Sequence, residues 1–192
     1  MGRWNHHQKP TNLSRVFAKR GICVAALVVL GALWLTTRFA NASELAAPVA
    51  GSWTIAVTAD EERQRRESIN QATKKLRSMQ RTMARQMLEK RTTPPEAIRI
   101  QVDAPIVIIG SGDRALELEL GGAPITVSGD DGTAKVRAKI DGDVLIVAVD
   151  GTRGGRLTSY RADGDRLSVV VSMSGSRLDG VVRYATTYTR AE

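Results

Sequence analysis

The chain has 192 residues and a formal net charge of +8, but only two histidines and one cysteine. These three residues are His6, His7 and Cys23, so residues 43–192 contain neither type. Their absence excludes Ser-His-Asp and Cys-His catalysis, ordinary zinc, copper or haem sites, and disulfides from that part of the chain. We therefore expect a protein that is not an enzyme and that has no cofactor and no metal.

Residues 1–42 predict a signal peptide or an N-terminal membrane anchor. The segment has no acid, and basic residues precede an uncharged stretch from Gly21 to Thr37, which Ala40-Asn41-Ala42 follows. This is the pattern of a secretory signal with a cleavage site of the A-x-A type. The apolar run is slightly shorter than the ~18–20 residues of a spanning helix, and an uncleaved anchor is the alternative. Either way we expect residues 43–192 to be extracytoplasmic, periplasmic or secreted.

Most of the net charge belongs to this leader. It carries six of the 28 cations and no acid, which leaves 22 cations against 20 acids in residues 43–192. A nearly neutral domain lacks the basic footprint of nucleic-acid-binding proteins, so we expect no nucleic-acid partner.

The domain that follows, residues 43–192, begins with a predicted strand over 53–58 and a predicted helix over 60–91. Trp53, Ile55 and Val57 alternate with other residues, which is the period of a strand. The helix has acids in its first turn and cations in its last, and Thr92-Thr93-Pro94-Pro95 ends it. It would be about 48 Å long against about 23 Å for a typical strand, so it either breaks or projects toward a partner.

One apolar stripe runs along this helix. The stripe could pack across the mouth or edge of the sheet, or the basic helix could dock a protein partner or an anionic membrane surface. For docking, the candidate partner-binding residues are Ile69, Leu76, Met79, Met83 and Met87.

Residues 98–190 predict an antiparallel meander. Apolar residues alternate with cations over 135–140 and with glutamates over 116–120, and Asp-Gly pairs such as Asp141-Gly142 separate the runs. Asp-Gly between alternating runs is a strong hairpin signal. We predict strands at 98–103, 105–109, 114–120, 124–128, 133–140, 143–150, 156–162, 166–173 and 181–190. The fold class is therefore mostly β with one long α-helix, as a barrel or half-barrel with the amphipathic helix inserted after the first strand.

Oxygen-rich turns and paired carboxylates are the remaining chemical motifs. The aspartates of the turns could hold Ca²⁺, but three similar turns along one meander favour plain hairpins. Glu117 and Glu119 share the charged face of an alternating strand, which favours a solvated outer face over a catalytic pair.

Gly51-Ser52-Trp53, followed by this meander, resembles the opening motif of the lipocalin and calycin barrels. The layout is also similar to that of uncharacterised secreted lipocalin-like proteins of bacteria. The resemblance covers 51–58 and 98–190, and the long helix departs from it. It implies that a late arginine, Arg183 or Arg190, packs over Trp53 and closes the base of the barrel. A plain core tryptophan is the alternative.

The resemblance further implies a binding module for an apolar or amphipathic small molecule or lipid. The inward faces of the strands would hold this ligand, or would simply fill a packed core. The candidate ligand-binding residues are Leu116, Leu118, Val136, Ile140, Val169, Val171, Tyr184 and Tyr188. The alternative function is a non-enzymatic envelope interaction protein that docks through helix 60–91.

Overall fold

The computed structural model describes residues 47–129 and 132–191. The predicted signal peptide or anchor over 1–42 lies outside these residues. Within the described part of the chain, no helix is long and apolar enough to cross a membrane.

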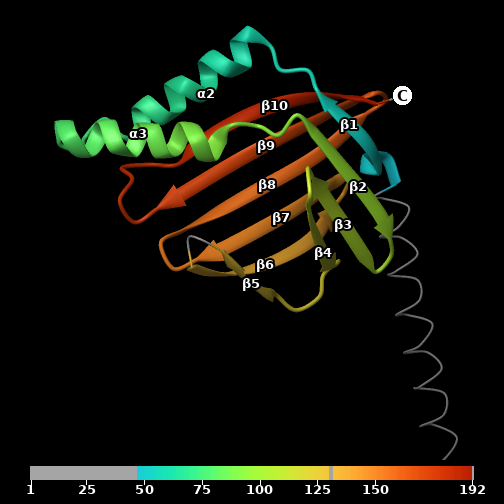
Figure 1. Cartoon of the computed structure of the whole chain (residues 1–192). Coiled ribbons are helices and arrows are strands. Elements are labelled where there is room, and N and C mark those ends of the chain that lie inside the picture. The colour runs from blue at the N-terminus through green and yellow to red at the C-terminus, as the bar shows by residue number, and fades with distance from the viewer. Residues whose placement is uncertain (1–46, 130–131, 192) are drawn as a thin grey trace, which may run out of the picture. The chain divides into compact units, whose positions relative to one another are not determined.

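Ten antiparallel strands form one sheet, in the order β4-β3-β2-β1-β10-β9-β8-β7-β6-β5 (Figure 1). The first strand thus lies between the second and the last, and the remaining neighbours follow chain order. This confirms the predicted antiparallel meander. The strands are β1 (Gly51–Ile55), β2 (Ala97–Asp103), β3 (Ile106–Ser111), β4 (Arg114–Glu119), β5 (Ile125–Gly129), β6 (Gly132–Asp141), β7 (Val144–Gly151), β8 (Gly154–Asp163), β9 (Arg166–Gly175) and β10 (Val182–Arg190).

The sheet curls into a nearly closed barrel. Just beyond β4, Leu120 forms a bridge with Ala138 of β6, and the Gly121 amide donates to the Ala138 carbonyl oxygen at 2.8 Å. The strands β4 and β5 are not paired with each other. The seam of the barrel therefore lies between β4 and β5 and is held together at one end.

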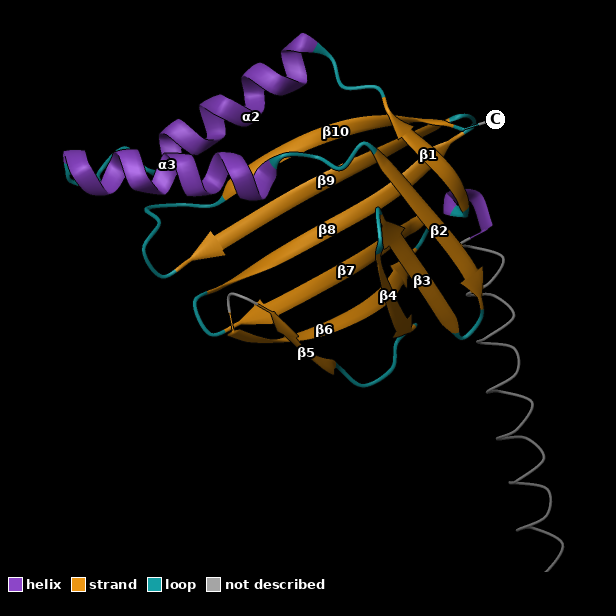
Figure 2. Ribbon diagram, in the orientation of Figure 1, coloured by secondary structure: helices purple, strands orange, loops and turns teal. Residues whose placement is uncertain are grey.

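The segment between β1 and β2 contains two helices, α2 (Ala59–Ala72) and α3 (Ser78–Thr92), rather than one helix over 60–91 (Figure 2). A contact distant in sequence explains the break. The Asp179 amide donates to the Ala72 carbonyl oxygen at 3.1 Å, and the Lys75 amide donates to Asp179 Oδ2 at 2.9 Å. These bonds satisfy backbone groups at the end of α2 and favour a turn over a continuing helix.

Helix α2 begins at a capping box that also explains why β1 is shorter than predicted. Thr58 caps the helix, its Oγ1 accepting from the Glu61 amide at 3.2 Å while the Thr58 amide donates to Glu61 Oε2 at 2.8 Å. The strand β1 ends at Ile55 and not at residue 58 as predicted, because residues 56–58 lead into the helix cap instead of continuing the strand.

Helix α2 covers the edge of β10 that β1 leaves unpaired. The β1 strand pairs only with residues 188–190 of β10. Further along this edge the Arg183 amide donates to Ser68 Oγ at 2.8 Å, and Thr187 Oγ1 donates to Glu61 Oε1 at 2.6 Å. The helix buries Ile69 in the core and protects an otherwise exposed strand edge.

The base of the barrel is built around Trp53, which is fully buried. Its indole nitrogen donates to the carbonyl oxygen of Val49, in the short 3-10 helix η1 (Ala47–Val49), at 3.0 Å. The Arg190 guanidinium lies 4.3 Å from the centre of the Trp53 ring. Of the two candidate arginines, Arg190 therefore occupies the position over the tryptophan, whereas the Arg183 side chain is exposed.

Gly51 makes room for this arginine. Its φ of 143° is one that other residues rarely adopt, and a Cβ atom there would lie 2.6 Å from Arg190 Nη1. The glycine of the Gly51-Ser52-Trp53 motif thus has a steric role at the base of the barrel.

Candidate functional site

The inward faces of the strands gather the predicted ligand-binding residues in one interior. Leu116 and Ile140 are partly buried and pack against the core. The other six are at most 5% exposed: Leu118, Val136, Val169, Val171, Tyr184 and Tyr188. Over most of its length this interior is therefore filled by side chains that pack on one another.

Arg156 shares this interior, although it is not among the residues predicted from the sequence. It lies in β8 two and four residues before the buried Thr158 and Tyr160, whereas Leu157 on the opposite face is 44% exposed. In the sheet Arg156 pairs with Val149 and Met173, which are both packed against the core. A cation therefore projects from the sheet into an apolar environment.

Arg156 is incompletely paired within the described part of the chain. Its Nε is buried and has no hydrogen-bond partner among the described residues. No carboxylate belongs to the buried set in that part of the chain. A buried donor without a partner is destabilising and rare in folded proteins.

All three tyrosines of the chain, Tyr160, Tyr184 and Tyr188, are buried in this interior. Burial raises the pKa of each phenol, and the nearby Arg156 cation opposes the rise in all three cases. The phenols therefore stay neutral at physiological pH and remain hydrogen-bond donors. The Tyr188 hydroxyl already donates to the Pro95 carbonyl oxygen at 3.1 Å.

A second arginine, Arg65 of α2, is paired with Glu62 and Thr92. Its Nη2 and Nε donate to the Glu62 carboxylate at 2.6 and 3.0 Å, and its Nη1 donates to Thr92 Oγ1 at 2.8 Å. The hydrogen bond from Arg65 holds the pKa of Glu62 below its usual value, and the same bond raises the pKa of Arg65. The Arg65 cation also opposes the rise in the pKa of Tyr184.

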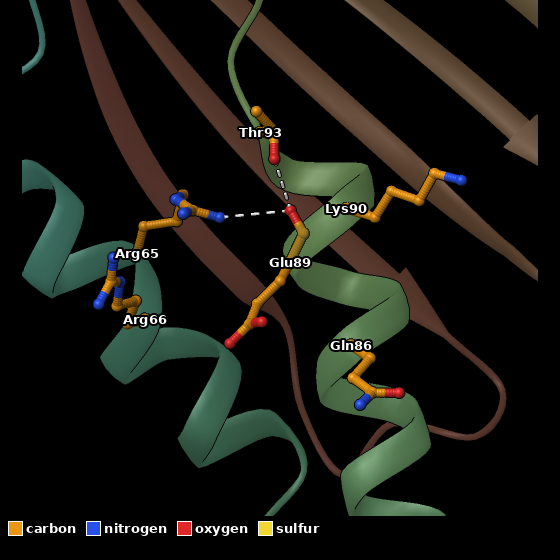
Figure 3. A pocket seen from close by; sticks show the side chains of 6 residues that line it. All are labelled: Arg65, Arg66, Gln86, Glu89, Lys90 and Thr93. Atoms are coloured by element: carbon orange, nitrogen blue, oxygen red, sulfur yellow. Dashed lines mark hydrogen bonds between the residues drawn. The ribbon is translucent and has the colours of Figure 1, made fainter.

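The groove between α2 and α3 is a separate feature of about 490 Å³ (Figure 3). It is lined by Arg65, Arg66, Gln86, Glu89, Lys90 and Thr93. The Glu89 carboxylate points toward α2 whereas the Lys90 side chain points away from it. Glu62 already pairs with both arginines. The groove is therefore polar and nearly balanced in charge, in contrast to the barrel interior.

The carboxylates that were considered for catalysis or metal binding lie elsewhere. Glu117 and Glu119 are exposed on β4. Within the described residues, no group of three or more His, Cys, Asp or Glu side chains could hold a metal ion.

No family profile and no curated protein sequence matches the chain. Solved structures with a similar fold include the REP1-NXSQ fatty acid transporter, with 16% identity and a TM-score of 0.47 over 77% of this chain and 98% of the other. Secretory abundant heat soluble protein 4 from Ramazzottius varieornatus has 16% identity and a TM-score of 0.48 over 76% and 96%. Human cRBP IV has 18% identity and a TM-score of 0.44 over 74% and 97%. These likenesses concern the fold alone.

Proposed function

We propose that this protein binds an amphipathic small molecule or lipid with an anionic head group. The apolar part of the ligand lies among the inward side chains of the barrel, and the head group lies at Arg156. The observation that carries the proposal is the buried Nε of Arg156, which has no hydrogen-bond partner among the described residues, because a buried donor without a partner is costly unless it meets an acceptor. The neutral phenols of Tyr160 and Tyr184 add donors for the same anion, whereas the Tyr188 hydroxyl already donates to the Pro95 carbonyl oxygen.

The ligand enters through the seam between β4 and β5. Ile125 of β5 pairs with the buried Val136 and so faces the interior, yet it is 38% exposed. Since these two strands share no ladder, they separate without breaking sheet hydrogen bonds along their length. Entry of a ligand here requires interior side chains to move apart, because they pack on one another without it.

The proposed role is binding and not catalysis. Residues 43–192 have no histidine or cysteine, and no carboxylate is among the buried residues of the described chain. Export through the segment 1–42 is part of the proposal and rests on the sequence pattern alone.

The test compares three fluorescent ligands of equal chain length, a fatty acid, a fatty alcohol and an alkylamine, on the purified full-length protein. The matched variants are Arg156→Met and Arg161→Met, which change the inner and the outer face of the same strand. Arg161 pairs at the surface with Asp143, so its loss should leave binding unchanged. All variants keep the same N-terminal segment, so differences between them report on the barrel.

We expect the native protein to prefer the fatty acid over the alcohol, and Arg156→Met to abolish this preference. A hydrogen bond to a charged group contributes about 1.5–3 kcal/mol, which corresponds to a loss of roughly 10- to 150-fold in affinity. Equal affinities of the Arg156→Met variant and the native protein for the fatty acid would refute the role of Arg156. Absence of binding for all three ligands would refute the function itself.

A further inference from the structure

The outer face of α3 carries three exposed methionines that the fold does not use. Met79, Met83 and Met87 are 79%, 58% and 54% exposed, whereas Leu88 and Thr92 on the inner face are buried. Their spacing of four residues places the three thioether side chains along one side of the helix. Scattered apolar residues on a surface are ordinary, but an aligned row of large ones suggests an interaction site.

The break between α2 and α3 explains why these side chains are uncovered. Ile69 and Ala72, which belong to the same stripe in the sequence, are buried in the core through α2. Leu76 lies in the connecting turn and is half-buried. Of the candidate partner-binding residues, the structure therefore assigns Ile69 to the core and leaves only the three methionines on a free surface.

Cations border this row at both ends. Lys74, Lys75 and Arg77 are exposed in the turn before α3, and Lys90 and Arg91 are exposed in its last turn. The one acid of α3 is Glu89, and its carboxylate points toward α2 in Figure 3. The methionine side of α3 thus combines an apolar row with positive ends and has no carboxylate of its own helix.

We propose that this outer face of α3 docks on an anionic lipid bilayer, with the helix parallel to the membrane surface. Flexible thioether side chains suit the irregular boundary between head groups and acyl chains, and the cations suit its negative potential. Helix α3 has no tryptophan and no tyrosine, which with arginine are the residues that usually dominate a protein–protein interface. A diffuse negative surface therefore fits this face better than a shaped protein partner does.

The test places an environment-sensitive fluorophore on the full-length protein at Met83→Cys or, as the control, at Thr126→Cys. Both variants also carry Cys23→Ser, so that the new thiol is the only one. Thr126 is exposed on β5 and distant in sequence from the helices. The N-terminal apolar segment is common to both proteins and tethers both probes equally if it enters a vesicle.

We expect the label at position 83 to shift to shorter wavelength on vesicles that contain phosphatidylglycerol, and the label at position 126 not to shift. Replacing Lys74, Lys75 and Lys90 by glutamine should weaken the affinity for these vesicles by on the order of a hundredfold, since each cation near an anionic surface contributes about fivefold to the affinity. These lysines are exposed, so near-ultraviolet circular dichroism should be unchanged.

Three results would overturn the proposal. Equal shifts at positions 83 and 126 would mean that the N-terminal segment alone governs the contact. Equal binding to pure phosphatidylcholine would remove the role of charge. A shift at position 83 that grows with protein concentration in the absence of vesicles would identify a second copy of the chain as the partner. None of these results depends on whether the barrel binds a ligand.

Discussion

Replacing Arg156 by methionine is expected to stabilise the ligand-free protein while removing its preference for an anionic ligand. The buried Nε of Arg156 has no hydrogen-bond partner in the described chain, and leaving such a donor unpaired costs about 1–3 kcal/mol. The rest of the side chain is only partly buried, so the lower end of this range applies. Methionine has a similar length and no polar hydrogen, and it can pack against Val149 and Met173.

We therefore expect the free energy of unfolding to rise by about 1 kcal/mol, and Tm to rise by about 2–4 °C for a chain of this size. Urea unfolding followed by circular dichroism at neutral pH measures the change, provided that the dependence on urea has the same slope in both proteins. Arg161→Met is the matched control. It removes a surface ion pair with Asp143 at 2.8 Å, in which both side chains are more than half exposed, and should change stability by less than about 1 kcal/mol.

A loss of more than about 1 kcal/mol in Arg156→Met would refute this reasoning. It would mean that Arg156 stabilises the empty barrel through the neighbouring phenols, and that the residue is structural. A gain in stability together with unchanged binding of the fatty acid would keep the energetic argument and refute the functional one.

Three further predictions concern the base, the helices and the tyrosines. Arg190→Met removes a cation–π contact and a hydrogen bond to the Ala50 carbonyl oxygen, and should lower the free energy of unfolding by about 1–2 kcal/mol in urea titrations. A similar loss from Arg183→Met would contradict the assignment of Arg190 to the position over Trp53. Because Arg65 lowers the pKa of Glu62 below 4.5, the pairing of Glu62 with Arg65 should stabilise the fold above that pH, and this stabilisation should be lost on acidification. In Glu62→Gln, Tm measured across this range should therefore depend less on pH than in the native protein. An unchanged dependence of Tm on pH would refute the linkage. All three tyrosines have a pKa raised above 10.0 by burial, so their stabilising contribution is present below pH 10 and lost as the pH rises above it. Ultraviolet absorbance of tyrosinate measures their ionisation. Its appearance near pH 10 in the folded protein would contradict the interior placement of the tyrosines.

Most of the strands were predictable because local chemistry determines both their faces and their ends. The alternation over 135–140 indicated the strand predicted at 133–140, which the structure extends by one residue at each end to Gly132–Asp141. Asp141-Gly142 ends this strand, with Gly142 at a φ of 61°. The order of the strands followed from the short turns between them. The pairing of β1 with β10 depends on closure of the whole sheet, which no local pattern encodes.

The position of the break in the helix and the role of Arg156 could not be predicted, for two physical reasons. The residues between α2 and α3 include Lys74, Lys75 and Leu76, which favour helix, and it is Asp179 from the far end of the chain that bonds the turn. In β8 both faces contain apolar and polar residues, so alternation left open whether Arg156 or Leu157 faces inward. The signal for the inward face was Tyr160, which shares a face with Arg156. Tyr160 is larger than Leu157 on the opposite face, so its burial indicates that the face with Arg156 lies inside.

The pairing of the first strand with the last also determines when this protein can fold. Trp53 pairs with Arg190, and α2 bonds to Arg183 and Thr187 of the same final strand. Contacts between distant parts of a chain form slowly, because the intervening loop must be closed before they can form. A chain that is still being synthesised, or that lacks its last strand, therefore exposes Trp53 and Ile69, and these are the side chains that a chaperone would meet first.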